Sequence, residues 1–134
     1  EIAKALINLS NSYCDDFIKT KEIKILINSI LNNPEYIGGT KSLDSNLIKI
    51  SNGKIFCKGG AEGVFLFTHL EKKIAGVLKV SDGNERALPS AIFSLIQNFK
   101  ILKKNKINEL KNFQIKKIKN HAGKIIGSIY SIVK

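Results

Sequence analysis

The chain has 134 residues, of which 43% are hydrophobic, and a formal net charge of +11, which suits one modest domain. No apolar run reaches the ~18 residues that a membrane span needs, and the N-terminus shows no signal-peptide pattern. We therefore predict a cytoplasmic protein without a membrane partner.

Two helices are expected first along the chain. Apolar residues at helical spacing predict a helix over residues 1–14, and a second one from Thr20, as its N-cap, to Asn33-Pro34. The chain contains no methionine, even at position 1, and it opens inside an apolar helical pattern without a capping residue. We therefore expect residues 1–134 to form a single partial domain that belongs to a longer protein.

Three strands should follow a turn-rich stretch in which Asp44 is expected to cap a short helical turn. The strands are predicted over residues 54–58, 63–70 and 74–81. After them we expect a helix with Ala91, Leu95, Ile96 and Phe99 on its buried side, a short basic helix over 105–113 and a final strand over 125–133. This order predicts an α+β fold, with helices packed on an antiparallel sheet.

The first strand runs into a glycine-rich stretch, Lys58-Gly59-Gly60-Ala61-Glu62-Gly63. Glycine costs backbone entropy beside a strand, so three glycines in six residues need a structural or functional reason. Their N–H groups could polarise a substrate carbonyl as an oxyanion hole, and Glu62 could orient a lysine or bind an amino group. The alternative is an ordinary hairpin with a G1-type bulge and a solvated Glu62.

Lys79 is the first candidate for catalysis. Strand alternation places it on the same face as Ala75 and Val77, so a partly buried amine is one interpretation. Burial disfavours the charged form of a lysine and allows it to act as a general base. The alternative is a lysine that reaches into solvent from the end of an exposed strand face.

Arg86 is the only arginine among 22 basic residues. An arginine in this lysine-rich chain suggests a planar contact with a carboxylate. Asp82 and Glu85 are close in sequence, so Arg86 is expected either to clamp the turn between strand and helix or to bind a substrate carboxylate.

Cysteine and histidine residues offer weaker signals. Cys14 and Cys57 form no CxxC motif and have no histidine cluster nearby, which favours two buried thiols over a disulfide and argues against a metal site within this chain. Neither His69 nor His121 has a serine–acid arrangement nearby in sequence, so we expect neither to be catalytic.

The basic excess lies at the C-terminal end, where residues 100–134 hold ten lysines and one acid, Glu109. Nucleic-acid sites usually combine arginine with stacked aromatic side chains, whereas this segment contains only Phe113 and Tyr130 as aromatics. We expect solvated lysine surface and no nucleic-acid partner. The alternative, a basic module that binds RNA or an acidic surface, predicts binding that weakens steeply with salt.

Taken together, Lys58-Gly59-Gly60-Ala61-Glu62-Gly63-Val64, Leu78-Lys79, Asp82-Gly83 and Arg86-Ala87 resemble the C-terminal half of the asparaginase II family, the serine–lysine asparaginases. Weaker similarities are Pro34 with Gly38-Gly39-Thr40, and Asn120-His121-Ala122-Gly123 leading to Gly127. They follow the family's order over nearly the whole chain.

This resemblance implies a scaffold related to serine β-lactamases and bacterial glutaminases, and hydrolysis of L-asparagine to L-aspartate and ammonia. It also implies a homodimer, and a zinc site through residues that precede this chain, with no cofactor bound within it. The nucleophilic serines would likewise precede it. A glutaminase or a penicillin-recognising hydrolase on the same scaffold is the alternative.

Residue by residue, the resemblance assigns Lys79 as the active-site lysine, which would activate a serine supplied by the missing half. It implies a substrate-binding set made up of Lys58, Gly60, Ala61, Glu62, Asp82 and Arg86. Gly59 stands where the wider fold has a hydroxyl residue, and Leu66 where some members have a cysteine.

Overall fold

The computed structural model describes residues 1–11 and 19–132 of the chain. The N-terminal elements are α1 (Ile2–Ser10), α2 (Thr20–Asn32), α3 (Glu35–Gly38) and α4 (Leu43–Ile50), followed by β1 (Ile55–Gly60), β2 (Val64–His69) and β3 (Ile74–Lys79). The rest comprises the 3-10 turn η1 (Glu85–Ala87), α5 (Leu88–Asn98), α6 (Lys104–Glu109), the 3-10 turn η2 (Lys111–Phe113), β4 (Ile115–Lys119) and β5 (Ile125–Tyr130). This arrangement confirms the α+β class.

The three predicted strands form one antiparallel sheet in the order β1-β2-β3. The register places Cys57 opposite Phe67, and Phe67 opposite Gly76, so these residues share one face of the sheet. Gly76 is required there, because a Cβ at this position would lie 2.3 Å from the Phe67 ring. The buried face of the sheet is therefore built around large side chains from the central strand.

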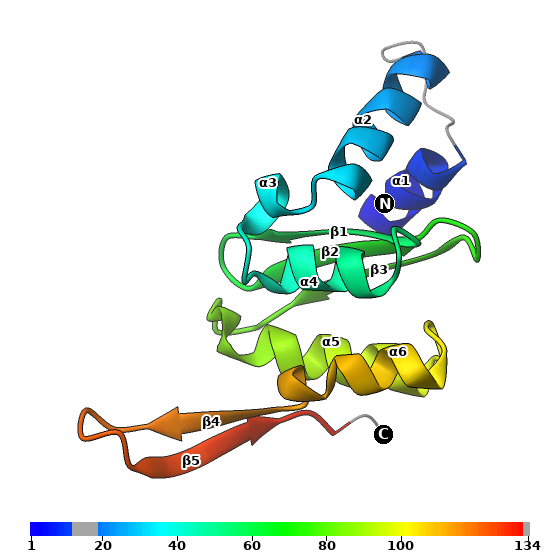
Figure 1. Cartoon of the computed structure of the whole chain (residues 1–134). Coiled ribbons are helices and arrows are strands. Elements are labelled where there is room, and N and C mark those ends of the chain that lie inside the picture. Colours follow the sequence, from blue (N-terminus) through cyan, green and yellow to red (C-terminus); the bar gives the residue numbers. More distant parts are fainter. Residues whose placement is uncertain (12–18, 133–134) are drawn as a thin grey trace.

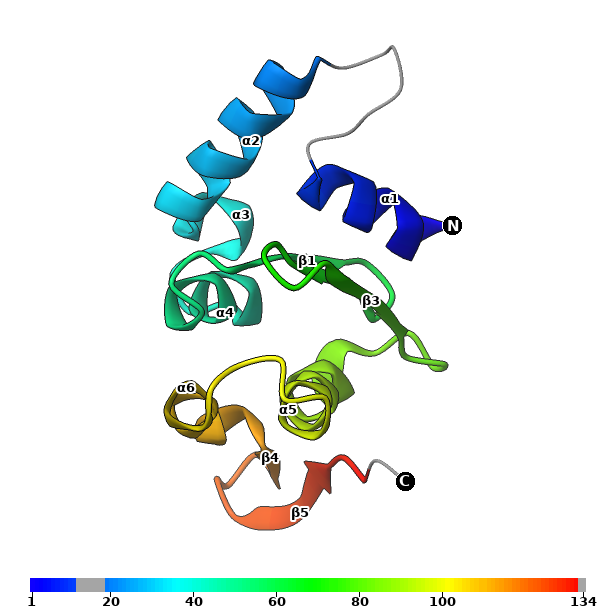
Figure 2. The ribbon, with the colours of Figure 1, turned by 90° about the vertical axis from the view of Figure 1, so that its right-hand side faces the viewer.

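Helices cover both faces of this sheet (Figures 1 and 2). Helix α1 packs on β2 and β3, whereas α4 and α5 lie on the opposite side. The core lies on that opposite side, and its central members are Leu47, Ile48, Ile55, Cys57, Phe65, Phe67, Leu88, Ile92, Phe93 and Ile96. Each fully buried Leu, Ile or Phe side chain contributes about 1.5–3 kcal/mol to stability, so this cluster holds the sheet and the two helices in place.

The helix starts differ from two of the predictions. Helix α2 begins at Thr20, but Thr20 is its first helical residue, and the Glu22 carboxylate accepts the N–H of the preceding Lys19 at 3.1 Å. Asp44 does not cap α4. Ser42 is the N-cap, since its backbone is extended and its Oγ accepts the N–H of Ser45 at 3.1 Å.

The buried apolar residues of α5 are Leu88, Ile92, Phe93 and Ile96, with Leu95 partly buried against them. The prediction is therefore confirmed for Ile96 and wrong for Phe99. Phe99 is 66% exposed because the helix ends at Asn98 and the chain turns back there. That turn buries Ile101, whose N–H donates to the carbonyl oxygen of Ile96 at 3.0 Å.

The two ends of the chain also depart from the predicted boundaries. Helix α1 ends at Ser10, and the remainder of the prediction for residues 1–14 largely falls outside the described residues, as do Cys14 and the last position of the predicted final strand. That strand is β5, and it pairs with β4 in a separate two-stranded sheet that the sequence analysis missed. The expected basic helix is divided between α6 and η2.

Among the described residues, no helix combines the length and apolar character that crossing a membrane requires.

A charged cleft as candidate functional site

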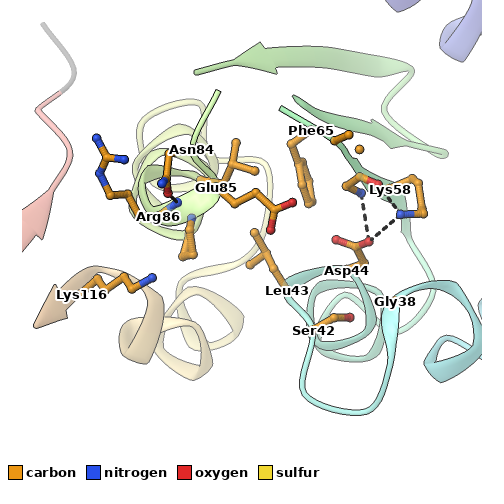
Figure 3. A pocket seen from close by; sticks show the side chains of 15 residues that line it. Gly38, Ser42, Leu43, Asp44, Lys58, Phe65, Asn84, Glu85, Arg86 and Lys116 are labelled. Carbon is orange, nitrogen blue, oxygen red and sulfur yellow. Dashed lines mark hydrogen bonds and ion pairs between the residues drawn. The ribbon is translucent and has the colours of Figure 1, made fainter. Parts of the chain in front are cut away.

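A cleft of about 750 Å³ opens at the end of the sheet where β1 finishes (Figure 3). One wall consists of the α3–α4 connection, the start of α4 and the end of β1. The other wall consists of η1, the start of α5 and Lys116 from β4. Phe65 from β2 lies between these walls. The cleft therefore brings together segments from all three thirds of the chain.

Asp44 is the central polar residue of the first wall. The residue is only 6% exposed, and its Oδ2 accepts the N–H of Gly59 at 2.9 Å and lies 3.6 Å from Lys58 Nζ. A Cβ on Gly59 would lie 3.3 Å from Asp44 Oδ1, and one on Gly38 would lie 3.0 Å from Oδ2. Both glycines thus leave room for this carboxylate. Because the Gly59 N–H is occupied by Asp44, it is not available to an oxyanion hole.

A short chain of hydroxyl groups fixes the segment that carries Asp44. Ser42 Oγ donates to Ser45 Oγ at 2.9 Å, and Ser45 Oγ donates to the carbonyl oxygen of Pro34 at 2.7 Å. Ser45 is fully buried, so these bonds satisfy polar groups that water does not reach. The result is a rigid connection from the α2–α3 junction to the first turn of α4.

The second wall begins with a turn that Arg86 and Asp82 stabilise. Asp82 Oδ1 accepts the N–H of Asn84 at 3.0 Å, and Asn84 Oδ1 accepts the N–H of Arg86 at 2.9 Å. Arg86 Nη2 pairs with the Asp82 carboxylate. The Asn84 N–H and the Arg86 guanidinium lower the pKa of Asp82 below its usual value. These contacts agree with the turn-clamp interpretation of Arg86, while the side chain also lines the cleft.

The charges around the cleft are mixed in sign. Lys58, Arg86 and Lys116 contribute positive groups, and Asp44 and Glu85 contribute carboxylates. In Figure 3 the Glu85 carboxylate points into the space between the two walls, and Lys116 lies on the same side as Arg86. Within the described part of the chain, neither Glu85 nor Lys116 forms an ion pair. Both are therefore available to a ligand with charges of both signs.

Four of the residues predicted from sequence line this cleft: Lys58, Gly60, Ala61 and Arg86. The other three are not among the lining residues: Glu62 and Asp82 lie in neighbouring turns, and Lys79 is the last residue of β3. The structure thus brings the predicted set to one end of the sheet. Four members line the cleft, and Glu62, Lys79 and Asp82 form a corner beside it.

Lys79 belongs to that corner. Its Nζ donates to the carbonyl oxygen of Glu62 at 2.6 Å and to that of Val80 at 2.9 Å. The side chain is exposed, which agrees with the alternative of a lysine at the end of an exposed strand face and rules out the interpretation as a partly buried amine. The reason is its position as the last residue of β3, an edge strand in the described sheet. Its catalytic role stays a prediction.

The glycines of the corner allow two turns to pack closely. Gly63 has φ +66°, and a Cβ there would lie 2.8 Å from Val80 Cβ. Gly83, at φ +74°, lies against Glu62. The Glu62 side chain itself is exposed, as the hairpin alternative predicts, and the β1–β2 register continues without a shift to Gly60 opposite Val64. Gly63 therefore serves backbone packing, whereas Gly60 lines the cleft.

A zinc site does not fit the described residues, which contain no group of three or more His, Cys, Asp or Glu side chains arranged to hold a metal ion. Cys57 is fully buried, and its Sγ donates to the carbonyl oxygen of Asp44 at 3.5 Å. Burial, with the Asp44 charge nearby, raises the pKa of this thiol far above its usual value, which keeps it from forming the thiolate that binds zinc.

Among the charged residues of the cleft, sequence reasoning missed three: Asp44 as a wall residue, Glu85 and Lys116. Asp44 did carry a signal, because it shares a helix face with Leu47 and Ile48, and a carboxylate on an apolar face needs a partner. Glu85 and Lys116 carried none, since only the packing of distant segments brings them to the cleft.

An α+β domain with a mixed-charge cleft between a strand end and a helix start has the features of a small-molecule site. The sequence profile of the L-asparaginase II family matches residues 1–131 of this chain, and the chain therefore belongs to that family. A comparison with curated proteins finds no match. Family membership supports an asparaginase-type hydrolase with a small-molecule substrate.

Proposed function

We propose that this domain serves the hydrolysis of L-asparagine to L-aspartate and ammonia, and that the charged cleft binds the amino acid. The observation that carries the proposal is the cleft's mixture of two carboxylates and three cations, contributed in part by residues of the family motif. A zwitterionic amino acid presents an ammonium and a carboxylate on the same carbon, so its site needs groups of both signs at short range.

The free groups of the cleft suggest how the substrate is oriented. Glu85 lacks an ion-pair partner in the described chain and is the natural acceptor for the α-ammonium group, with Asp44 across the cleft. Lys116 is the corresponding free cation for the α-carboxylate. Arg86 adds further N–H donors, since its pairing with Asp82 leaves part of the guanidinium free. Lys58 remains beside Asp44.

The nucleophile is proposed to come from polypeptide outside this chain. In that proposal, residues 1–134 form the C-terminal half of a β-lactamase-like catalytic domain. Ser42 is the hydroxyl that lines the described cleft, but its Oγ is engaged with both the N–H and the Oγ of Ser45. Ser51 and Lys54 have S-x-x-K spacing, yet Ser51 Oγ donates to the carbonyl oxygen of Ile48 and Lys54 pairs with Glu71. Neither serine is arranged as an activated nucleophile.

We assign Lys79 the activation of that serine, on the basis of its match to the family motif. In an active enzyme that contains this segment, Lys79→Ala should lower kcat by several orders of magnitude, because the nucleophile and its base act as a unit. Lys73→Ala, at an exposed turn position on the same hairpin, is the matched control and should leave kcat unchanged. Near-normal turnover in Lys79→Ala would remove Lys79 from the mechanism.

Binding can be tested on the 134-residue chain by titration with L-asparagine, followed by amide chemical shifts. We expect saturable shifts around residues 58–61 and 84–86, and at least fivefold weaker binding in Glu85→Gln and Lys116→Gln. Lys117→Gln is the matched control, since it removes one exposed lysine from the same strand and does not line the cleft. L-Glutamine, one methylene longer, should bind more weakly. A folded chain without localised shifts would refute the cleft assignment.

A homodimer is also proposed for the active protein. In its support, the β4–β5 hairpin and the segment after it expose large apolar side chains, among them Ile126 at 63% and Ile132 at 73%. Exposed apolar surface of this kind usually marks an interface. Light scattering after size exclusion should give the mass of two chains, and a monomer at 100 µM would contradict the proposal. The zinc that the resemblance implies would have to be bound by residues outside this chain.

A further inference from the structure

A second cleft, of about 360 Å³, lies at the opposite end of the sheet from the first. Its walls are the segment before β1, the β2–β3 turn and the α5–α6 connection, which lie at one end of the molecule in Figure 1. Four lysines line it (Lys54, Lys72, Lys103 and Lys106), against a single carboxylate, Glu71. The family match and the first cleft assign nothing to this place.

His69 provides a neutral hydrogen-bond donor in the wall of this cleft. The residue is 2% exposed, and its Nδ1 accepts the N–H of Lys72 at 3.2 Å. Burial, reinforced by the Lys72 charge, lowers the pKa of His69, so the imidazole is neutral near pH 7. With Nδ1 as acceptor, the proton resides on Nε2. That N–H has no hydrogen-bond acceptor among the residues that the structure describes.

The lysines differ in how far they are already engaged. Lys72 Nζ donates to the carbonyl oxygens of Lys100 and Ile101 at 2.9 and 2.8 Å, which fixes the α5–α6 connection against the hairpin turn. Lys54 pairs with Glu71 at 2.7 Å, and Lys106 pairs with Glu109 at 3.0 Å. Lys103 has no acidic partner in the described ranges.

We propose that this second cleft binds a small divalent oxyanion of the phosphate type, held by the Nε2–H of His69 and the ammonium group of Lys103, with Lys72 adding its remaining donor. The N–H of His69, unpartnered in the described part of the chain, and the positive charges of the lysines both favour an anion that carries several hydrogen-bond acceptors. Lysine is a common point-charge ligand of phosphate groups. The proposal concerns this chain's own residues and does not depend on the function of the first cleft.

The test is a titration of the 134-residue chain with inorganic phosphate at pH 7 and low ionic strength, followed by amide and imidazole chemical shifts. We expect saturable shifts at residues 69–72 and 101–106. Lys103→Gln should weaken binding about three- to fivefold, which is the scale of one exposed charge contact. Lys117→Gln changes the net charge equally and should leave the affinity unchanged. Equal effects of these two variants would overturn the proposal.

Variants of His69 separate a bound anion from general attraction to lysines. His69→Leu should weaken phosphate binding at least tenfold, while His69→Gln, which keeps an N–H donor, should retain part of it. If His69→Leu does not fold, the comparison of Lys103→Gln with Lys117→Gln decides whether the cleft binds phosphate. Glycerol 3-phosphate distinguishes a phosphate ester from free phosphate as the ligand, since only the ester gains from contacts beyond the phosphate group. Acetate bound as tightly as phosphate would refute a divalent oxyanion site.

Discussion

Replacement of Asp44 by alanine tests the architecture of the first cleft most directly. The substitution removes the acceptor of the Gly59 N–H, a hydrogen bond of 2.9 Å to a buried charged group, and this costs about 1.5–3 kcal/mol. The ion pair with Lys58 adds little, about 0.2–1 kcal/mol, because the Lys58 side chain is 48% exposed and screened by water. We expect a loss of about 2–3 kcal/mol in the free energy of unfolding.

For a chain of this length such a loss lowers Tm by roughly 6–15 °C, which is measurable by circular dichroism or urea denaturation. Asp44→Asn keeps an oxygen acceptor for Gly59 and should lose less than half as much. Asp82→Ala, at an exposed carboxylate, provides a control with a small effect on stability. If Asp44→Ala unfolds within 0.5 kcal/mol of wild type, the carboxylate does not anchor β1, and the description of this wall is wrong.

Three further predictions concern positions outside the cleft. Gly63→Ala should lower the free energy of unfolding by about 2–4 kcal/mol, because a Cβ there meets Val80 at 2.8 Å. Gly123→Ala, with a similar φ but open space around it, should cost only about 1 kcal/mol. Equal losses of the two variants in urea denaturation would contradict this reasoning. The pKa of His69 is lowered in the folded chain, so the unfolded chain binds more protons in acid. The free energy of unfolding should therefore fall as the pH drops below about 6.5, and His69→Gln should flatten that slope. An unchanged slope in the variant would show that His69 does not cause the pH dependence. In a Cys14→Ser background, Cys57 should react with a thiol reagent at pH 8 only after denaturant is added, and rapid labelling of the native chain would show that the thiol is accessible.

The central sheet could be predicted from the sequence because its information is local. Strand alternation and the short polar turn determine β2 and β3, and the observed register pairs them as an ordinary hairpin from His69 opposite Ile74 to Val64 opposite Lys79. The clamp between Asp82 and Arg86 spans only four residues, so its two members could be recognised together. The same locality explains why Lys58 and Gly60 were correctly placed at the C-terminal end of the first strand.

The cleft itself could not be predicted, because its walls are far apart in sequence. Even within the first wall, Asp44 and Gly59 are fifteen residues apart, and the second wall adds residues 84–89 and Lys116 from β4. That strand was missed because every residue of Ile115–Lys119 is exposed and three of the five are lysines, so it has no alternation between buried and solvated residues. The exposure of Lys79 could not be decided from sequence for a different reason. Alternation shows which strand face a side chain occupies, but only the strand order shows that β3 is an edge strand of the described sheet.

The polar groups of the cleft and its corner share one physical feature: main-chain atoms orient them. The Gly59 N–H holds Asp44, two carbonyl oxygens hold Lys79, and the Asn84 N–H holds the carboxylate that in turn holds Arg86. Main-chain partners are positioned by the fold, so these groups need little reorganisation when a ligand arrives. At Gly59 the absence of a Cβ makes this contact possible, because a Cβ there would lie 3.3 Å from Asp44 Oδ1. Gly59→Ala should therefore shift the Asp44 carboxylate and weaken L-asparagine binding in the chemical-shift titration, and unchanged affinity would show that Asp44 does not depend on this contact.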